Sequence, residues 1–315
     1  MTGPVAAIDC GTNSIRLLVA EPLHDGATGE VSALRDLDRQ MRIVRLGQGV
    51  DRTGRLEQAA LERTFAALRD YAERIDELGA TNVRMVATSA SRDAENAAEF
   101  VTGVRQILGV EPEVVTGDTE AALSYRGATA GVSASLAPSP RLVVDIGGGS
   151  TELVLGEGPR VLAARSVDVG CVRMTERHLL GDPPSSEQVA ATTADVDAAI
   201  ALAARTVPLQ RANSLVGLAG SVTTVAAIHL RLSAYDPVAI HGHLVPTADV
   251  AAISDDLLGM SHDERAAIGS MHPGRVDVIA AGALVLRRVL DATGLDGVVA
   301  SERDILDGIA WSMLE

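Results

Sequence analysis

The sequence contains no lysine, so all 27 of its basic residues are arginines. This absence excludes a lysine Schiff-base mechanism and a P-loop that contacts phosphate through lysine. A phosphate-binding site in this chain therefore has to use backbone N–H groups, hydroxyl groups, arginine or a metal ion. The formal net charge of −15 also argues against general nucleic-acid binding, which needs a basic surface.

Aromatic residues, cysteines and long apolar runs are also scarce. Only 2% of the residues are aromatic, so Leu, Val, Ile and Ala have to build the cores. The two cysteines, Cys10 and Cys171, cannot form a disulfide framework and are typical of a reducing compartment. No apolar run reaches the roughly 18 residues of a membrane-spanning helix, and we see no signal peptide. We therefore expect a cytoplasmic protein with no membrane or nucleic-acid partner.

The hydrophobic pattern predicts strands that alternate with helices. Apolar residues at three- and four-residue spacing predict a long helix over 57–78, and the chain length suggests roughly two domains. Further helices are expected at 93–108, 118–131, 187–207, 222–232, 248–260, 263–268, 276–292 and 305–314. Strands are expected at 5–9, 17–20, 83–87, 113–115, 214–218 and 297–300. This order favours sheets covered by helices, with a proline-containing connection at 131–140.

Two glycine-containing hairpins, one at the start of each half, share a sequence pattern. Residues 9–21 read DCGTNSIRLLVAE, and residues 145–157 read DIGGGSTELVLGE. Aligned on their first aspartate, the two segments have identical residues at five positions: Asp9 and Asp145, Gly11 and Gly147, Ser14 and Ser150, Leu17 and Leu153, Glu21 and Glu157. This match indicates one supersecondary unit that is used twice.

Such hairpin turns suit a phosphate chain. Glycine lets the backbone approach an anion closely, and successive N–H groups form an anion-binding concavity. The side chains of Asn13, Ser14, Ser150 and Thr151 would add further donors. A single glycine-rich hairpin is more often only a tight turn, but a matched pair favours two turns that face one phosphate chain.

The paired hairpins resemble those of the sugar kinase/heat-shock/actin superfamily. With TSASRDAEN at 88–96, TGDTEAALSYRG at 116–127 and GLAGSVTT at 217–224, the set resembles the exopolyphosphatase/guanosine pentaphosphatase (Ppx/GppA) family over nearly the whole chain. The resemblance implies an α/β fold of two actin-like (ribonuclease H-like) domains with an interdomain cleft. Domain I would comprise residues 1–126 completed by 301–315, and domain II residues 127–300. Long family members carry an extra C-terminal helical domain, so the chain resembles the short, two-domain members.

The resemblance also implies a function. Family members release orthophosphate from the end of inorganic polyphosphate, or remove the terminal phosphate of guanosine pentaphosphate, by attack of water. We expect an exopolyphosphatase, with guanosine pentaphosphate hydrolysis as the alternative. A sensor that binds polyphosphate or guanosine tetra- or pentaphosphate without hydrolysing it stays open, because binding uses the same loops. A sugar or small-acid kinase is disfavoured by the 116–127 motif. A homodimer is common in the family and is a further expectation.

The resemblance assigns Glu120 as the base that orients and deprotonates the attacking water. The family motif often has a second acid just before this position, where this chain has Thr119. From the sequence alone, an acid in the first turn of a helix is more often a partner of the helix dipole. Asp145 and Glu152 are the expected ligands of Mg²⁺ (or Mn²⁺), and Asp9 would contribute through water or stabilise its turn.

The expected phosphate ligands lie in the two hairpin turns and in two further loops. Arg92, at the start of a helix, would bind two phosphate oxygens through its guanidinium group, unless it is a solvated surface arginine. The glycine turn before residue 222 supplies backbone and hydroxyl donors, unless it only serves packing. The complete expected set is Thr12, Asn13, Ser14, Arg92, Gly147, Gly148, Gly149, Ser150, Thr151, Gly220 and Ser221.

Overall fold

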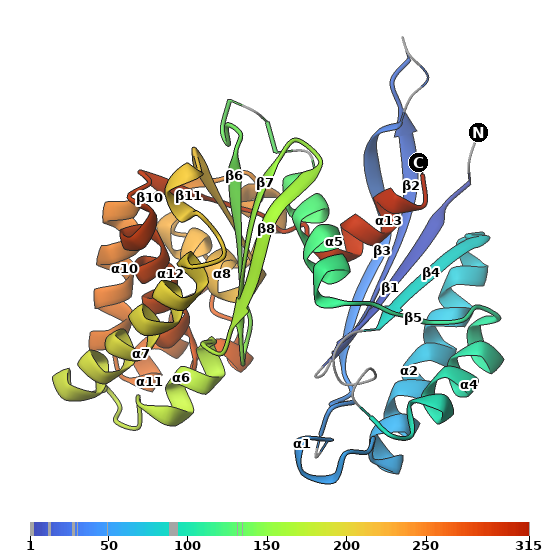
Figure 1. Ribbon diagram of the computed structural model, residues 1–315, viewed down its shortest axis with the longest axis horizontal. Helices are drawn as coiled ribbons and strands as arrows, with labels where there is room; N and C mark the ends of the chain where they lie inside the picture. Colours follow the sequence, from blue (N-terminus) through green and yellow to red (C-terminus); the bar gives the residue numbers. More distant parts are fainter. Residues whose placement is uncertain are drawn as a thin grey trace. The chain divides into compact units, whose positions relative to one another are not determined.

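The chain divides into two compact units. A computed structural model describes residues 3–11, 14–26, 29, 31–48, 50–87, 94–130, 132–133 and 135–314. Unit 1 consists of Met1–Gly127 with Ile305–Glu315, and unit 2 is Ala128–Asp304 (Figure 1). No helix in these described ranges is both long enough and apolar enough to cross a bilayer.

Unit 1 is built on a five-stranded sheet with the order β3-β2-β1-β4-β5. β1 pairs antiparallel with β2 and parallel with β4. The strands are β1 (Val5–Cys10), β2 (Ser14–His24), β3 (Val31–Ile43), β4 (Asn82–Ala87) and β5 (Glu113–Val114). The helices are α1 (Val50–Thr53), α2 (Gln58–Glu77), α4 (Ala97–Leu108), α5 (Gly117–Thr129) and α13 (Ile305–Ser312).

Helices cover both faces of this sheet, which explains why β1 is buried along its whole length. Ala6 and Ile8 face the core under α2 and α4, whereas Val5 and Ala7 face α5 and α13, because successive strand side chains point to opposite faces (Figure 1). The C-terminal helix α13 thus completes a unit that begins at the N-terminus.

Unit 2 is built on a six-stranded sheet with the order β10-β11-β9-β6-β7-β8. β6 pairs antiparallel with β7 and parallel with β9, so its centre repeats the arrangement of β2, β1 and β4. The strands are β6 (Arg141–Ile146), β7 (Thr151–Glu157), β8 (Arg160–Val167), β9 (Ser214–Leu218), β10 (Leu244–Pro246) and β11 (Gly297–Ala300).

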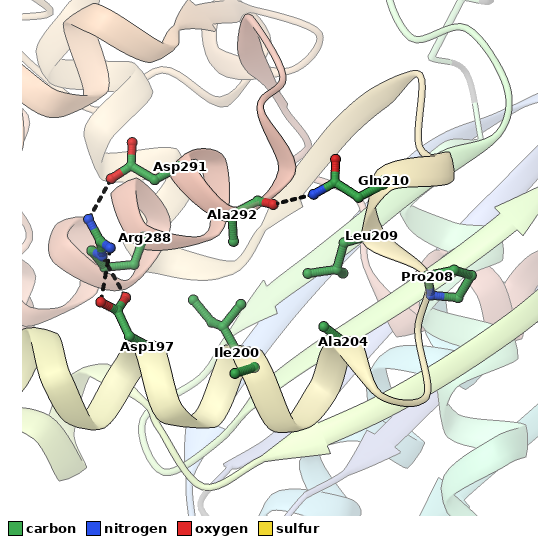
Figure 2. Close-up of a pocket in the computed structure, with 10 residues that line it drawn as sticks. Asp197, Ile200, Ala204, Pro208, Leu209, Gln210, Arg288, Asp291 and Ala292 are labelled. Carbon is green, nitrogen blue, oxygen red and sulfur yellow. Dashed lines mark hydrogen bonds and ion pairs between the residues drawn. The ribbon is translucent and has the colours of Figure 1, made fainter.

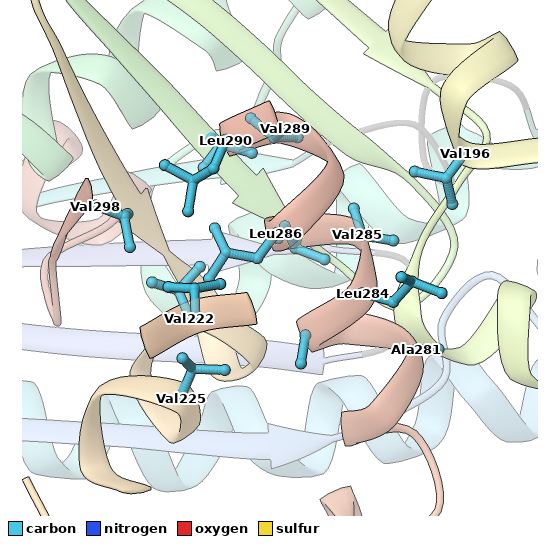
Figure 3. Packing of buried hydrophobic residues seen from close by; sticks show 14 of the residues in the cluster. Val196, Val222, Val225, Ala281, Leu284, Val285, Leu286, Val289, Leu290 and Val298 are labelled. Carbon is cyan, nitrogen blue, oxygen red and sulfur yellow. The ribbon is translucent and has the colours of Figure 1, made fainter. Parts of the chain in front are cut away.

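The helices of unit 2 share one hydrophobic core with the sheet. They are α6 (Cys171–Arg177), α7 (Ser186–Ala204), α8 (Ala219–His229), α9 (Pro237–Ile240), α10 (Thr247–Gly259), α11 (His262–Ala266) and α12 (Ile279–Thr293), with 3-10 turns at Leu209–Arg211 and Pro273–Arg275. Side chains of α12, such as Leu286, meet those of Val222 and Val225 on α8 and Val298 on β11 (Figure 3). All four are buried aliphatic residues, consistent with the low aromatic content.

The structure differs from the predicted elements mainly in unit 2. β8 and α6 were not predicted, although both lie beside the 147–150 turn. The helix predicted to begin at residue 222 begins at Ala219 instead, directly after the last residue of β9. Ala219 has a φ of 64°, and this left-handed conformation turns the chain from strand to helix without intervening loop residues. The helix predicted from residue 276 begins at Ile279, after the 3-10 turn.

Candidate functional site

The two hairpins close with the same hydrogen bond, in agreement with their matching sequences. In unit 1 the N–H of Gly11 donates to the carbonyl of Ser14 at 3.0 Å, and in unit 2 the N–H of Gly147 donates to the carbonyl of Ser150 at 3.0 Å. The residues before and after each turn form the last pair of each ladder. Thr12 and Asn13, two of the predicted phosphate ligands, lie outside the described residues.

Two carbonyl groups of the second turn, those of Gly147 and Gly148, point to the first turn of α6. The N–H of Cys171 donates to the carbonyl of Gly147 at 2.9 Å, and the carbonyl of Gly148 accepts from Val172 at 2.9 Å and from Arg173 at 3.0 Å. Because the peptide bond is planar and trans, the N–H on the other side of each bond points away from α6.

These outward N–H groups belong to Gly148 and Gly149, both of which are exposed. Neither N–H donates a hydrogen bond to another residue in the described part of the chain. Two successive free donors on an exposed glycine turn form the kind of concavity that binds an anion. The side of the 147–150 turn that faces away from α6 therefore presents two adjacent N–H donors.

The carboxylates predicted to bind metal are neighbours on this hairpin. Asp145 and Glu152 are directly paired across β6 and β7, so their side chains leave the sheet on the same face. Both residues are half-buried. The hydroxyl of Ser166 on β8 donates to Oε1 of Glu152 at 2.6 Å. Two adjacent hard oxygen donors fit Mg²⁺, which binds through one or two carboxylates and completes its shell with water and phosphate.

In unit 1, the cross-strand pair that corresponds to Asp145 and Glu152 has an arginine in place of the glutamate. Asp9 pairs with Arg16 across β1 and β2, and Arg16 stands where Glu152 stands in the second hairpin. The Arg16 guanidinium donates to Oδ2 of the buried Asp9 carboxylate from Nε at 3.0 Å and from Nη2 at 2.6 Å. This ion pair fixes the Asp9 carboxylate, which was predicted to assist a metal ion through water. The two hairpins therefore share their closing hydrogen bond, but the pair before and after the turn is Asp–Arg in unit 1 and Asp–Glu in unit 2.

The structure corrects the prediction that Thr151 supplies a hydroxyl donor to phosphate. Thr151 is buried, and its Oγ1 donates to the carbonyl of Val169 at 2.6 Å. A hydroxyl group has one proton to donate, and here that proton is used to hold the segment between β8 and α6.

The third glycine segment, predicted as a loop, forms the first turn of α8 and is covered by other side chains. Nη1 of Arg275 donates to the carbonyl of Gly220 at 3.0 Å and lies 3.0 Å from the hydroxyl oxygen of Thr224. Ser221 is buried, and a Cβ on Gly282 of α12 would lie 2.2 Å from its hydroxyl oxygen. Burial raises the pKa of the neighbouring Cys171 thiol, and a hydrogen bond with Ser221 acts in the opposite direction. The phosphate-binding roles of Gly220 and Ser221 stay predictions.

Glu120 lies in the first turn of α5 and is half-buried. Thr116 precedes the helix, and its Oγ1 accepts from the N–H of Thr119 at 3.3 Å and lies 3.1 Å from the Thr119 hydroxyl. Thr119, where the family often has an acid, therefore belongs to the N-terminal cap of α5. This cap fixes the turn that carries Glu120. Arg92, the predicted phosphate-binding arginine, lies outside the described residues.

A pocket in unit 2 lies apart from these residues. It has a volume of 450 Å³ and lies between α7, the 3-10 turn at 209–211 and α12 (Figure 2). Arg288 and Asp197 form a two-point ion pair at one side of it, with distances of 2.7 Å and 2.9 Å. None of the predicted site residues lines this pocket.

Sequence reasoning missed two residues beside the 147–150 turn. Arg173 lies over Gly149, with a guanidinium nitrogen 3.4 Å from where a Cβ on that glycine would be, and it pairs with Asp168 at 3.3 Å. Gly170 packs under the turn carbonyls. The sequence signal for both is the Gly-Cys-Val-Arg segment at 170–173, an arginine three residues after a glycine in a chain without lysine.

Comparisons with known proteins agree with the predicted family. The model of the Ppx/GppA phosphatase family matches residues 26–315. Exopolyphosphatase 2 of Mycobacterium tuberculosis is 49% identical to this chain over 318 residues, which cover 98% of each protein. The guanosine-5'-triphosphate,3'-diphosphate pyrophosphatase of Vibrio cholerae is 42% identical over 173 residues, which cover 55% of this chain and 33% of that protein.

A solved structure gives the same result for the fold. The type II variant of the Aquifex aeolicus Ppx/GppA phosphatase superposes with a TM-score of 0.84 at 32% identity, covering 98% of this chain and 99% of that chain. The predicted fold class, two actin-like α/β domains, is confirmed by this likeness and by the two mixed sheets.

Proposed function

Because the chain belongs to the Ppx/GppA phosphatase family, we propose that it is an exopolyphosphatase. It hydrolyses the terminal phosphoanhydride bond of inorganic polyphosphate and releases orthophosphate. The observation that carries this proposal is the near-full-length similarity to the mycobacterial exopolyphosphatase 2. The N–H groups of the exposed residues Gly148 and Gly149 support it, because a phosphate chain needs such donors.

In the proposed reaction, a water molecule attacks the terminal phosphorus and the bond to the bridging oxygen breaks. The products are orthophosphate and a chain shortened by one phosphate. Glu120 orients this water and accepts its proton, which suits a carboxylate held in place by a capped helix turn. Phosphoryl transfer depends mainly on positioning and on stabilisation of charge. The hydrogen-bond donors that stabilise the negative charge on the phosphate oxygens are the N–H groups of Gly148 and Gly149, together with Ser14, Ser150 and Arg92.

A divalent cation is part of the proposal. Asp145 and Glu152 would hold Mg²⁺ or Mn²⁺, which neutralises charge on the phosphate oxygens when bound. Their direct pairing across β6 and β7 supports this assignment. Asp9 is the third candidate, and its carboxylate is already fixed by Arg16. In the described ranges no group of three or more His, Cys, Asp or Glu residues is placed so that it could hold a metal ion. Two paired carboxylates that leave the other coordination positions to water and phosphate fit Mg²⁺.

Hydrolysis of guanosine pentaphosphate is the second candidate function. It is favoured by the similarity to the Vibrio cholerae pyrophosphatase, which covers about half of this chain. Both substrates end in a phosphoanhydride, so the same turn and the same base serve either reaction. The cytoplasmic location, the homodimer and the domain boundaries stay predictions.

Orthophosphate release from four substrates tests the proposal. Tripolyphosphate, long-chain polyphosphate, guanosine pentaphosphate and ATP would each be incubated with the protein and Mg²⁺, with EDTA as the matched control. We expect metal-dependent release that is fastest from a polyphosphate. Preferential release from guanosine pentaphosphate would establish the second candidate, and no release from any substrate would refute both.

A further inference from the structure

The segment between β8 and α6 runs against the 147–150 turn and binds it from three successive positions. The N–H groups of Cys171, Val172 and Arg173 donate to the carbonyls of Gly147 and Gly148 at 2.9 to 3.0 Å. The first N–H groups of a helix have no partner within the helix. Here the turn carbonyls satisfy these groups, so α6 and the turn hold each other in place.

Gly170 makes this contact possible, because it leaves no room for a side chain. A Cβ at this position would lie 2.5 Å from the carbonyl oxygen of Gly148 and 2.7 Å from that of Gly147. The backbone of Gly170 is extended, with φ −147° and ψ 166°, so any residue could adopt its conformation. The requirement for glycine is therefore one of space alone.

The same segment also accepts a hydrogen bond from Thr151. Its buried hydroxyl donates to the carbonyl of Val169 at 2.6 Å, one residue before Gly170. Thr151 directly follows the turn at the start of β7. The segment is thus hydrogen-bonded both to the strand that leaves the turn and to the turn itself.

We propose that Gly170 and the first turn of α6 form a clamp that holds the 147–150 turn with its carbonyls inward and its Gly148 and Gly149 N–H groups outward. The clamp comprises Val169–Arg173 and the Thr151 hydroxyl. Gly170 is then a positioning residue for the phosphate-binding turn. This inference rests on the proposed function, since it assigns the outward N–H groups to substrate phosphate.

Gly170→Ala tests the clamp directly. The added Cβ would lie 2.5 Å from the carbonyl oxygen of Gly148, and an ordinary contact is 3.4 Å. We expect the turn carbonyls to move away by the difference, about 0.9 Å. A misplacement of about 1 Å costs on the order of 100-fold in rate. We expect kcat/KM for tripolyphosphate to fall by about that factor, with a parallel rise in the Kd of tripolyphosphate measured by calorimetry without metal.

Two glycines of unit 2 provide matched controls. Gly297→Ala would bring its Cβ within 2.6 Å of the Val245 carbonyl, at the end of the sheet opposite to the turn. It imposes a similar clash without touching the clamp, so we expect a lower Tm with unchanged Kd. Gly259→Ala meets nothing within 4 Å and has no positive φ, so we expect wild-type behaviour.

A second variant tests the hydrogen bonds if Gly170→Ala does not fold. Cys171 is the first residue of α6, where proline is favoured, and the extended Gly170 before it suits a proline. Cys171→Pro removes the N–H that donates to Gly147, and Cys171→Ala removes only the side chain. We expect the proline variant to bind tripolyphosphate at least several-fold more weakly than the alanine variant.

The outcomes separate this inference from the proposed function. Wild-type affinity and kcat/KM in Gly170→Ala, or an equal loss of affinity in Gly297→Ala, would overturn the clamp. Equal affinities in Cys171→Pro and Cys171→Ala would do the same. If the wild-type protein binds tripolyphosphate without hydrolysing any substrate, and Gly170→Ala still weakens that binding, the proposed function fails and the clamp is supported.

Discussion

Replacing Gly308 with alanine should displace the helix that carries Glu120. Gly308 lies on α13 and packs against the backbone of α5, where Leu123 is one helical turn after Glu120. A Cβ on Gly308 would lie 1.9 Å from the carbonyl oxygen of Leu123 and 2.7 Å from its carbonyl carbon. Both atoms belong to the backbone, so no side-chain rotation relieves the overlap.

The size of the effect follows from this overlap. To reach an ordinary contact of 3.4 Å from 1.9 Å, α13 and α5 must separate by about 1.5 Å. Overpacking of this kind lowers the free energy of unfolding by about 1–3 kcal/mol. Alanine has a better helix propensity than glycine, which offsets about 1 kcal/mol of this loss. The base on α5 moves by a similar distance, and a misplacement of about 1 Å costs on the order of 100-fold in rate.

The assay is kcat/KM for orthophosphate release, alongside Tm, with Gly103→Ala as the matched control. Gly103 lies on α4, and a Cβ there would lie 2.2 Å from the ring of Phe65 on α2. This clash is also in unit 1, but it does not involve α5. We expect Gly308→Ala to lose about 100-fold in kcat/KM, whereas Gly103→Ala keeps wild-type kcat/KM whatever its Tm. Wild-type activity in a folded Gly308→Ala protein would refute the reasoning.

Two further predictions concern stability. Leu286→Ala, in the buried centre of α12 (Figure 3), should lower the free energy of unfolding in urea by about 2–5 kcal/mol; a loss well under 1 kcal/mol would contradict the packing. Hydrogen bonds from His178 and then Arg177 hold the pKa of Asp195 below its usual value. The stability they contribute is therefore present above the unfolded-state pKa of about 3.9 and is lost as the pH falls through the folded-state pKa. Asp195→Asn should be less stable than the wild type by up to about 1 kcal/mol at pH 5, and a difference that persists at pH 2 would contradict this assignment.

The hairpins could be predicted from the sequence because their determinants are local. The spacing of Asp, Gly and Ser in 9–14 and 145–150 specifies the same turn, and the structure gives both turns the same closing hydrogen bond. The register that the turn fixes then pairs Asp145 with Glu152, and paired residues have their side chains on the same face of the sheet. The long helix at 57–78 could also be predicted from the sequence, since the apolar residues of its buried face recur with a clear helical period.

The rest of the site depends on contacts between distant parts of the chain. The closeness of Gly170 to Gly148 results from the path of β8 and α6, and neither element was predicted. Thr151 was taken for a phosphate ligand because its residue type allowed it, and only the fold shows that its proton goes to Val169. A loop was predicted at 218–222 because of its glycines, but the left-handed conformation of Ala219 lets α8 begin directly after β9.

The proposed role of Glu120 is tested most directly by orthophosphate release from tripolyphosphate with Mg²⁺, compared between the wild type and Glu120→Gln. Glu111→Gln, an exposed glutamate before β5, is the matched control. We expect Glu120→Gln to lose about 10²–10⁴-fold in kcat, the usual contribution of a general base, while its Kd for tripolyphosphate stays at the wild-type value. Wild-type kcat in Glu120→Gln would contradict the account, because the attacking water would then have another base.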